Sequence, residues 1–135
     1  MKIGIATSWR RMKERYLLAG SHCDTCGLDF FPTRKICPLC RRKGKLSEKQ
    51  FKGTGEVYSY TTVFAPPTGF HLRAPYVLAL VKLDEGPMVL GMVEDTKPEN
   101  VNIGSKVEKI YRKWVDEDEG GLIHYGFAFK LIQGQ

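Results

Sequence analysis

The sequence predicts a mainly β protein with an N-terminal helix, a rubredoxin-like zinc ribbon and a five-stranded OB-fold barrel. Three observations lead to this prediction. All four cysteines lie in two Cys-x-x-Cys pairs between positions 23 and 40. From position 51 onward, β-branched and aromatic residues recur in short alternating runs that are typical of strands. Five such runs, with no long helix between them, favour a small closed antiparallel sheet.

The expected boundaries follow these changes in composition. Residues 1–20 are expected to form the helix, residues 21–46 the ribbon and residues 47–135 the barrel. A chain of 135 residues suits one small domain with an attached metal module. No apolar run approaches the ~20 residues of a membrane span, and nothing resembles a secretory signal. We therefore expect a cytoplasmic protein that does not enter the membrane.

Residues 3–19 have the pattern of an amphipathic helix that Gly20 would end. Its apolar stripe consists of Trp9, Met12, Tyr16 and Leu17. A lone helix of this length is marginal in water, so the stripe must be buried against something. Both ordinary packing within the chain and docking on another protein fit the pattern.

The cysteine pairs predict one metal site with Cys23, Cys26, Cys37 and Cys40 as ligands. Two thiolates three positions apart can reach one ion when the backbone turns between them, and two such knuckles complete the tetrahedral set of a structural zinc. No thiol remains for catalysis. Two disulfides are the alternative, but paired Cys-x-x-Cys units without a secretory signal favour metal. Iron in a rubredoxin-like site remains open.

The positive charge of the chain is concentrated in its first 52 residues. They hold 13 basic and 4 acidic residues, a net charge of +9, whereas the remainder has 8 basic and 11 acidic residues, a net charge of −3. This imbalance indicates an anionic partner for the helix and ribbon: nucleic acid, a phosphate-bearing cofactor or an acidic protein surface. A solvated basic face with no partner is the alternative.

The five expected strands cover residues 57–64, 76–83, 88–93, 106–115 and 122–132. In the first, strict alternation would place Val57 and Ser59 on one face and Tyr58 and Tyr60 on the other. In the fourth, it would place Val107 and Trp114 on opposite faces.

The order of these motifs resembles a known family. A basic helix with Trp9 leads into Cys23-x-x-Cys26-Gly27, Phe31-Pro32 and Cys37-Pro38-x-Cys40. Gly53-x-Gly55-x-Val57-Tyr58-Ser59 and Pro75-Tyr76-Val77-x-Ala79-x-Val81 follow, and Tyr125-x-Phe127 lies in the last strand. This arrangement resembles the Zn-ribbon/OB-fold acyl-CoA-associated proteins of archaea and bacteria, long catalogued as a domain of unknown function. The resemblance covers nearly the whole chain.

The resemblance implies a non-catalytic partner of thiolase-superfamily enzymes. In archaea the implied setting is the complex of acetoacetyl-CoA thiolase with 3-hydroxy-3-methylglutaryl-CoA synthase, at the head of the mevalonate route. The barrel is expected to bind or enclose CoA or acyl-CoA. Clustered cations suit the CoA phosphates and aromatic side chains suit its adenine. The expected CoA-binding residues are Arg10, Arg11, Arg34, Lys35, Tyr58, Phe70, His71 and Arg73.

Two other classes of function were weighed. OB barrels with zinc ribbons also bind single-stranded nucleic acid, but the expected barrel is net acidic and lacks a basic stripe. An enzyme is disfavoured because the sequence has no nucleophile with a recognisable base, no His-Glu metal pair and no phosphate loop of the Gly-Lys-Ser type. We therefore expect no autonomous activity.

Overall fold

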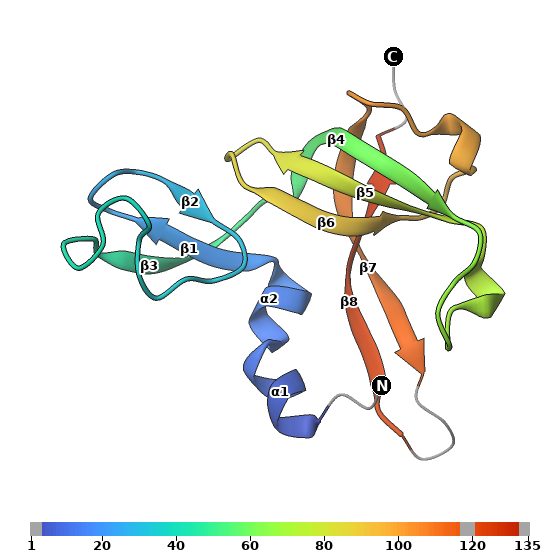
Figure 1. Ribbon diagram of the computed structural model, residues 1–135, viewed down its shortest axis with the longest axis horizontal. Helices are drawn as coiled ribbons and strands as arrows, with labels where there is room; N and C mark the ends of the chain where they lie inside the picture. The colour runs from blue at the N-terminus through green and yellow to red at the C-terminus, as the bar shows by residue number, and fades with distance from the viewer. Residues whose placement is uncertain (1–3, 117–120, 133–135) are drawn as a thin grey trace.

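The computed structural model describes residues 4–116 and 121–132. A small three-stranded sheet lies on one side of a closed barrel, and two short helices lie beside a hairpin that projects from the barrel (Figure 1). The mainly β class predicted from the sequence is confirmed. None of the helices in the described ranges is long and apolar enough to cross a membrane.

The N-terminal helix is broken into two short helices. Helix α1 spans Ile5–Arg10 and helix α2 spans Met12–Leu17. The prediction that Gly20 ends the helix is wrong, because Leu18 adopts the left-handed conformation (φ 54°) and caps α2. Gly20 lies in the next strand, where a Cβ would clash with the carbonyl oxygen of Phe30. The role of Gly20 is therefore to allow its strand to pack closely against the strand that contains Phe30, and not to end the helix.

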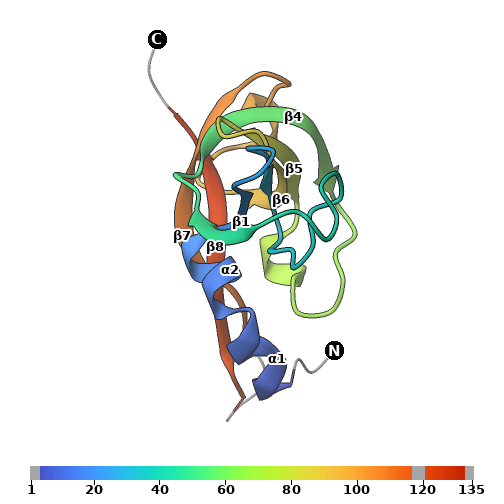
Figure 2. The same ribbon diagram turned by 90° about the vertical axis from the view of Figure 1, so that its left-hand side faces the viewer.

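The break also changes which face of the helix is buried. Met12 and Tyr16 are half-buried, and the ring of Tyr16 lies 5.3 Å from that of Tyr111 on the barrel hairpin. Trp9 belongs to the other helix and is 73% exposed. The predicted apolar stripe is therefore only partly buried within the chain. Figure 2 shows both helices alongside the hairpin.

The ribbon is an antiparallel sheet with the strand order β2-β1-β3. Its strands are β1 (Ala19–Cys23), β2 (Asp29–Phe30) and β3 (Leu46–Gln50). Strand β3 was not predicted, because Leu46 is its only apolar residue and the strand lacks an alternating pattern. It runs along β1 over five residue pairs, from Ala19 with Gln50 to Cys23 with Leu46.

The barrel closes in the order β4-β5-β6-β8-β7, with β7 pairing back to β4. Its strands are β4 (Thr54–Val63), β5 (Tyr76–Leu83), β6 (Met88–Val93), β7 (Lys106–Asp116) and β8 (Ile123–Leu131), with short 3₁₀ turns η1 (His71–Arg73) and η2 (Pro98–Asn100). Strand β6 pairs with β8 in parallel instead of with its sequence neighbour β7. This Greek-key order is that of the predicted OB fold.

Two bulges overturn the alternation expected for β4 and β7. Val57 pairs with Val81 and Ser59 with Leu80, so Tyr58 is an extra residue and is 56% exposed. Val57 and Ser59 consequently do not share a face. The register of β7 shifts in the same way at Trp114, which turns toward the core. A bulge inserts one residue and re-aims the side chains that follow it.

One apolar core joins the barrel to the ends of the ribbon. It includes Phe127, Phe129 and buried valines of β4 to β7. Leu18 and Phe51, which flank the ribbon sheet on its barrel side, are 0% and 1% exposed within the same cluster. Phe31 of the ribbon packs edge-on against Phe127, with ring centroids 5.9 Å apart. The two parts are therefore packed against each other.

Candidate metal centre and docking surfaces

Two similar turns place the four cysteines. The amide of Gly27 donates to the carbonyl of Cys23 (2.7 Å), and the amide of Arg41 donates to that of Cys37 (2.8 Å). Gly27 and Arg41 both adopt positive φ, 75° and 52°. Each Cys-x-x-Cys pair is thus folded back by one hydrogen bond between equivalent positions. The Cys23–Gly27 turn is called the first knuckle and the Cys37–Arg41 turn the second knuckle.

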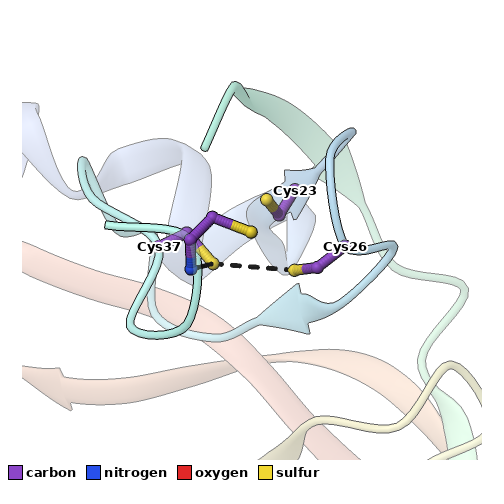
Figure 3. A group of neighbouring side chains, drawn as sticks. Cys23, Cys26 and Cys37 are labelled. Atoms are coloured by element: carbon purple, nitrogen blue, oxygen red, sulfur yellow. Dashed lines mark hydrogen bonds between the residues drawn. The ribbon is translucent and has the colours of Figure 1, made fainter. Parts of the chain in front are cut away.

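The turns bring all four thiols into one cluster. The sulfurs of Cys23, Cys26, Cys37 and Cys40 lie within 4.8 Å of one another. Figure 3 shows the side chains of Cys23, Cys26 and Cys37 converging, with the sulfurs of Cys26 and Cys37 3.6 Å apart. Four sulfurs around a tetrahedral ion with metal–sulfur bonds of 2.3 Å would be about 3.8 Å apart. The cluster can therefore hold a metal ion with little rearrangement.

Two of the four thiols are enclosed, whereas Cys40 is half-buried and Cys26 is exposed. Cys23 and Cys37 are 0% exposed, and the amide of Cys40 points at the Cys37 sulfur at 3.5 Å. Gly44 lies against the cluster, where a Cβ would come within 2.8 Å of the Cys37 Cβ and 3.0 Å of the Cys40 Cβ. The glycine thus keeps space for four sulfurs and an ion. Nothing in the sequence pattern around Gly44 predicts this role.

The thiols differ in how readily they ionise. Hydrogen bonds from the backbone amides of Cys26 and Thr25 outweigh burial and lower the pKa of Cys23 to about 6. Burial, together with the neighbouring sulfurs, raises the pKa of Cys40 to about 12. The thiolate is the form that binds metal, and the Cys23 thiol loses its proton more readily than the Cys40 thiol.

A buried carboxylate ties the ribbon strands together. Asp29 on β2 accepts a hydrogen bond from Lys49 Nζ at 2.6 Å and lies 2.6 Å from His22 Nδ1. Its side chain is 7% exposed. Burial opposes ionisation, but the hydrogen bonds from Lys49 and His22 outweigh it and lower the pKa of Asp29. His22 is thus a structural residue on β1.

The residues proposed for CoA binding are spread over the molecule. Arg10, Arg11, Arg34 and Lys35 lie on the helices and ribbon and are exposed. Tyr58 is the bulged residue of β4. Phe70, His71 and Arg73 lie in the loop between β4 and β5, on the side of the barrel away from the ribbon (Figure 1).

A groove of about 360 Å³ lies beside this loop. Of the eight residues expected to bind CoA, Arg73 alone lines it. Arg73 Nη1 lies 3.2 Å from Glu94 Oε1, and Arg73 Nη2 donates to the carbonyl of Lys113. Arg112 pairs with Glu94 at 3.6 Å and with Asp95. The positive charge in and around the groove is therefore already paired with carboxylates.

The outer surface of β5 and β6 is apolar. Leu80 pairs with Leu90 and Leu78 with Met92, and residues directly opposite each other in antiparallel strands share a face. Leu90 is 63% and Met88 is 41% exposed, and Leu78, Leu80 and Met92 are half-buried, whereas Val81 and Val89 point into the core. The patch made by Leu78, Leu80, Met88, Leu90 and Met92 is here called the apolar barrel face.

Comparisons with known proteins agree with this fold. The family profile described as ChsH2, C-terminal OB-fold domain, matches residues 48–111. A DUF35 domain-containing scaffold protein of Methanocaldococcus jannaschii is 44% identical over 129 residues, which are 96% of this chain and 92% of that protein. The chain belongs to the DUF35 domain-containing scaffold proteins. The resemblance to this Zn-ribbon/OB-fold family is thus confirmed.

Two further proteins are similar to this chain, one in structure and one in sequence. The solved structure named Ltp2-ChsH2(DUF35) aldolase has a TM-score of 0.69 and 27% identity, over 97% of this chain and 96% of that one. A probable enoyl-CoA hydratase alpha subunit of Thermomonospora curvata is 30% identical over 111 residues, 82% of this chain and 33% of that protein. The near-full-length match to scaffold proteins indicates a non-catalytic, accessory role for this DUF35 chain.

Proposed function

We propose that this chain is a scaffold that docks on thiolase-superfamily enzymes, of the acetoacetyl-CoA thiolase and 3-hydroxy-3-methylglutaryl-CoA synthase type, and helps to enclose CoA or acyl-CoA. A thiolase-type reaction requires a free cysteine nucleophile, and all four thiols here converge in one cluster. His22 is bound to Asp29 in the ribbon, while His71 is exposed and His124 is buried in the barrel. The chain supplies surfaces, and its partner supplies the chemistry.

The apolar barrel face is the observation that carries the docking proposal. In OB folds the face of the second and third strands is a binding surface, usually for oligonucleotides or oligosaccharides. Here it presents leucine and methionine side chains, and Lys82 is the charged neighbour at its end. An exposed, contiguous apolar patch is typical of a protein–protein contact, and methionine adapts well to a partner surface.

The same face argues against single-stranded nucleic acid as the ligand. Binding of single strands needs aromatic side chains for base stacking and a basic groove along the backbone. The apolar barrel face has neither, and the cations of the described chain are concentrated on the helices and ribbon.

Zinc is the metal that we assign to the four-cysteine cluster. Four thiolates in a closed tetrahedral arrangement are the usual ligands of structural zinc, whose role is to hold a small fold together. Iron prefers the same ligands, so metal analysis decides between the two ions.

CoA would lie against the scaffold at residues with unpaired charge. Among the described residues, Arg10, Arg11 and Lys35 make no ion pair, and the Arg34 guanidinium lies 5.5 Å from the centre of the Phe30 ring. They suit the phosphates. The loop with Phe70 and His71 lies on the side of the barrel away from the ribbon, so we do not expect Phe70 and His71 to contact the same CoA molecule as Arg34 and Lys35. Arg73 would have to exchange Glu94 for a phosphate, so we expect it to contribute least.

The docking proposal is tested by binding of the purified protein to the two enzymes of its own host. Leu90→Glu places a charge on the apolar barrel face without disturbing the core. Ile103→Glu is the matched control, because Ile103 is 71% exposed in the loop before β7. We expect Leu90→Glu to weaken binding at least about tenfold, as loss of a buried apolar anchor does, and Ile103→Glu to bind like the wild type. Equal binding by Leu90→Glu, or preferential capture of RNA, would contradict the proposal.

A further inference from the structure

The two cysteine knuckles have the same backbone but use their side chains differently. In the first knuckle, Asp24 accepts a hydrogen bond from Ser47 Oγ at 3.2 Å. Thr25 Oγ1 donates to the Lys43 carbonyl at 3.4 Å and accepts from the Lys45 amide at 3.3 Å. The side chains of the first knuckle therefore fasten the ribbon to itself.

The second knuckle turns its side chains to solvent. Ile36 and Leu39 are 64% and 70% exposed, although they are the apolar residues of this turn. The side chains of Arg41, Arg42 and Lys43 are exposed and form no ion pair within the described part of the chain. We call these five residues the knuckle surface.

Arg41 is placed where a glycine would be favoured. Gly27 occupies the equivalent position of the first knuckle, and both have positive φ. The left-handed conformation is unfavourable for a residue with a Cβ. Because glycine would serve the turn better, the arginine at this position indicates a use for its side chain.

From these observations we propose that the knuckle surface binds an acidic patch on the partner enzyme, with Ile36 and Leu39 as apolar anchors and the three cations paired with carboxylates. This inference rests on the proposed scaffold function and assigns a second contact, separate from the apolar barrel face. Arginine is enriched in protein interfaces, and the exposed Ile36 and Leu39 beside it offer apolar area that a partner would bury.

The charge of the knuckle surface, and its lack of aromatic side chains, favour an acidic protein surface as its binding partner. Residues 34–45 hold Arg34, Lys35, Arg41, Arg42, Lys43 and Lys45 and no acidic residue. A single-stranded nucleic acid would stack its bases on aromatic rings, and the two ribbon phenylalanines are engaged. Phe31 packs on Phe127 of the barrel, and Phe30 lies beneath Arg34.

An alternative role for the cations is to neutralise the negative charge of a metal ion held by four thiolates, without any contact with a partner. The variant Arg41→Gly distinguishes this role from binding to a partner enzyme. If Arg41 only offsets that charge, its removal weakens metal affinity. If it contacts the partner, removal relieves the positive-φ strain, so metal affinity and thermal stability stay equal or rise while docking weakens.

The experiment measures the dissociation constants of the metal-loaded protein for the host's thiolase and 3-hydroxy-3-methylglutaryl-CoA synthase, at low and moderate salt. We expect Arg42→Glu and Leu39→Ser to weaken binding to one enzyme about tenfold or more, and Arg41→Gly to weaken it about threefold or more. Salt should weaken wild-type binding. Lys97→Glu, at an exposed site in the barrel, is the charge-matched control and should bind within about twofold of the wild type.

Each outcome separates the two proposals. If the wild type binds an enzyme and the knuckle variants bind it equally well, the knuckle inference is wrong and the scaffold function stands. If the wild type binds neither enzyme, both fall. If Arg41→Gly loses metal affinity, or if these variants lose binding to anionic vesicles or to an oligonucleotide instead of to an enzyme, the knuckle inference is also overturned.

Discussion

The ribbon and the barrel of this protein are stabilised in different ways. The barrel buries a continuous apolar core in which Phe129, Val81 and Ala79 are 0% exposed. In the ribbon, Cys23 and Cys37 of the four-cysteine cluster are 0% exposed, and the buried Ser21 of β1 is polar. A unit of about 30 residues cannot bury enough apolar surface to fold alone. We expect a metal ion bound by the four-cysteine cluster to stabilise the ribbon as apolar burial stabilises the barrel.

Cys37→Ser should have the largest effect and should separate the two parts. It removes a buried ligand, and the metal supplies most of the folding free energy of so small a module. We expect the ribbon amides of β1 and β3 to lose protection from hydrogen exchange while the barrel amides keep theirs. One equivalent of metal and a wild-type melting profile in this variant would show that the metal is dispensable.

Phe129→Ala should produce the opposite pattern. The ring is fully buried and packs at 5.9 Å from Phe127. Loss of a buried aromatic side chain costs about 3–5 kcal/mol of the free energy of unfolding. Denaturant unfolding should therefore show a less stable barrel, whereas metal stoichiometry should remain at one ion per folded chain. A variant that loses its metal under native conditions would mean that the ribbon depends on the barrel core.

Asp29→Asn should weaken the ribbon by an intermediate amount. It removes the charge that Lys49 and His22 contact, at a cost of about 1–3 kcal/mol. Because the pKa of Asp29 is lowered below 3.8, its contribution is complete above that pH and is lost only as the pH falls through the lower value. The variant should thus be less stable than the wild type by the same amount at pH 7.5 and pH 9, as measured by hydrogen exchange of β1 at saturating metal. A difference that changes between these pH values would point to another group.

Lys109→Met should have the smallest effect on stability. It tests whether the barrel or the ribbon stabilises the position of helix α2. Lys109 Nζ donates to the carbonyl of Leu17 at 3.3 Å, and burial lowers the pKa of this lysine. Methionine keeps the stem and loses the hydrogen bond, which is worth about 0.5–1.5 kcal/mol. Amide exchange of α2 should accelerate accordingly.

The control is Lys13→Met, which removes the exposed ion pair with Glu48 of the ribbon, 3.1 Å long. Exposed pairs contribute little, so exchange should change less than in Lys109→Met. A larger effect in Lys13→Met would mean that the ribbon, and not the barrel, holds the helix.

The cysteine cluster and the order of helix, ribbon and barrel could be predicted from the sequence. Cys-x-x-Cys spacing constrains the backbone locally, so the cluster follows from the chain itself. Strand runs such as Tyr76–Leu83 are long and strongly patterned, and they appear where expected. Both signals depend on neighbouring residues alone.

Features that depend on distant contacts could not be predicted. The bulges at Tyr58 and Trp114 arise from pairing with β5 and β8, and they change which face each side chain occupies. Gly20 was misread because its neighbour Phe30 is ten positions away in sequence. The apolar barrel face and the different use of the two knuckles become visible only when strand register and exposure are known.

The most direct test of the metal-held ribbon is elemental analysis combined with thiol counting on native, untagged protein. The account predicts one zinc ion per chain and four cysteines that become reactive thiols only after the metal is removed. Protein without bound metal, in which Cys23, Cys26, Cys37 and Cys40 are oxidised in pairs, would contradict it.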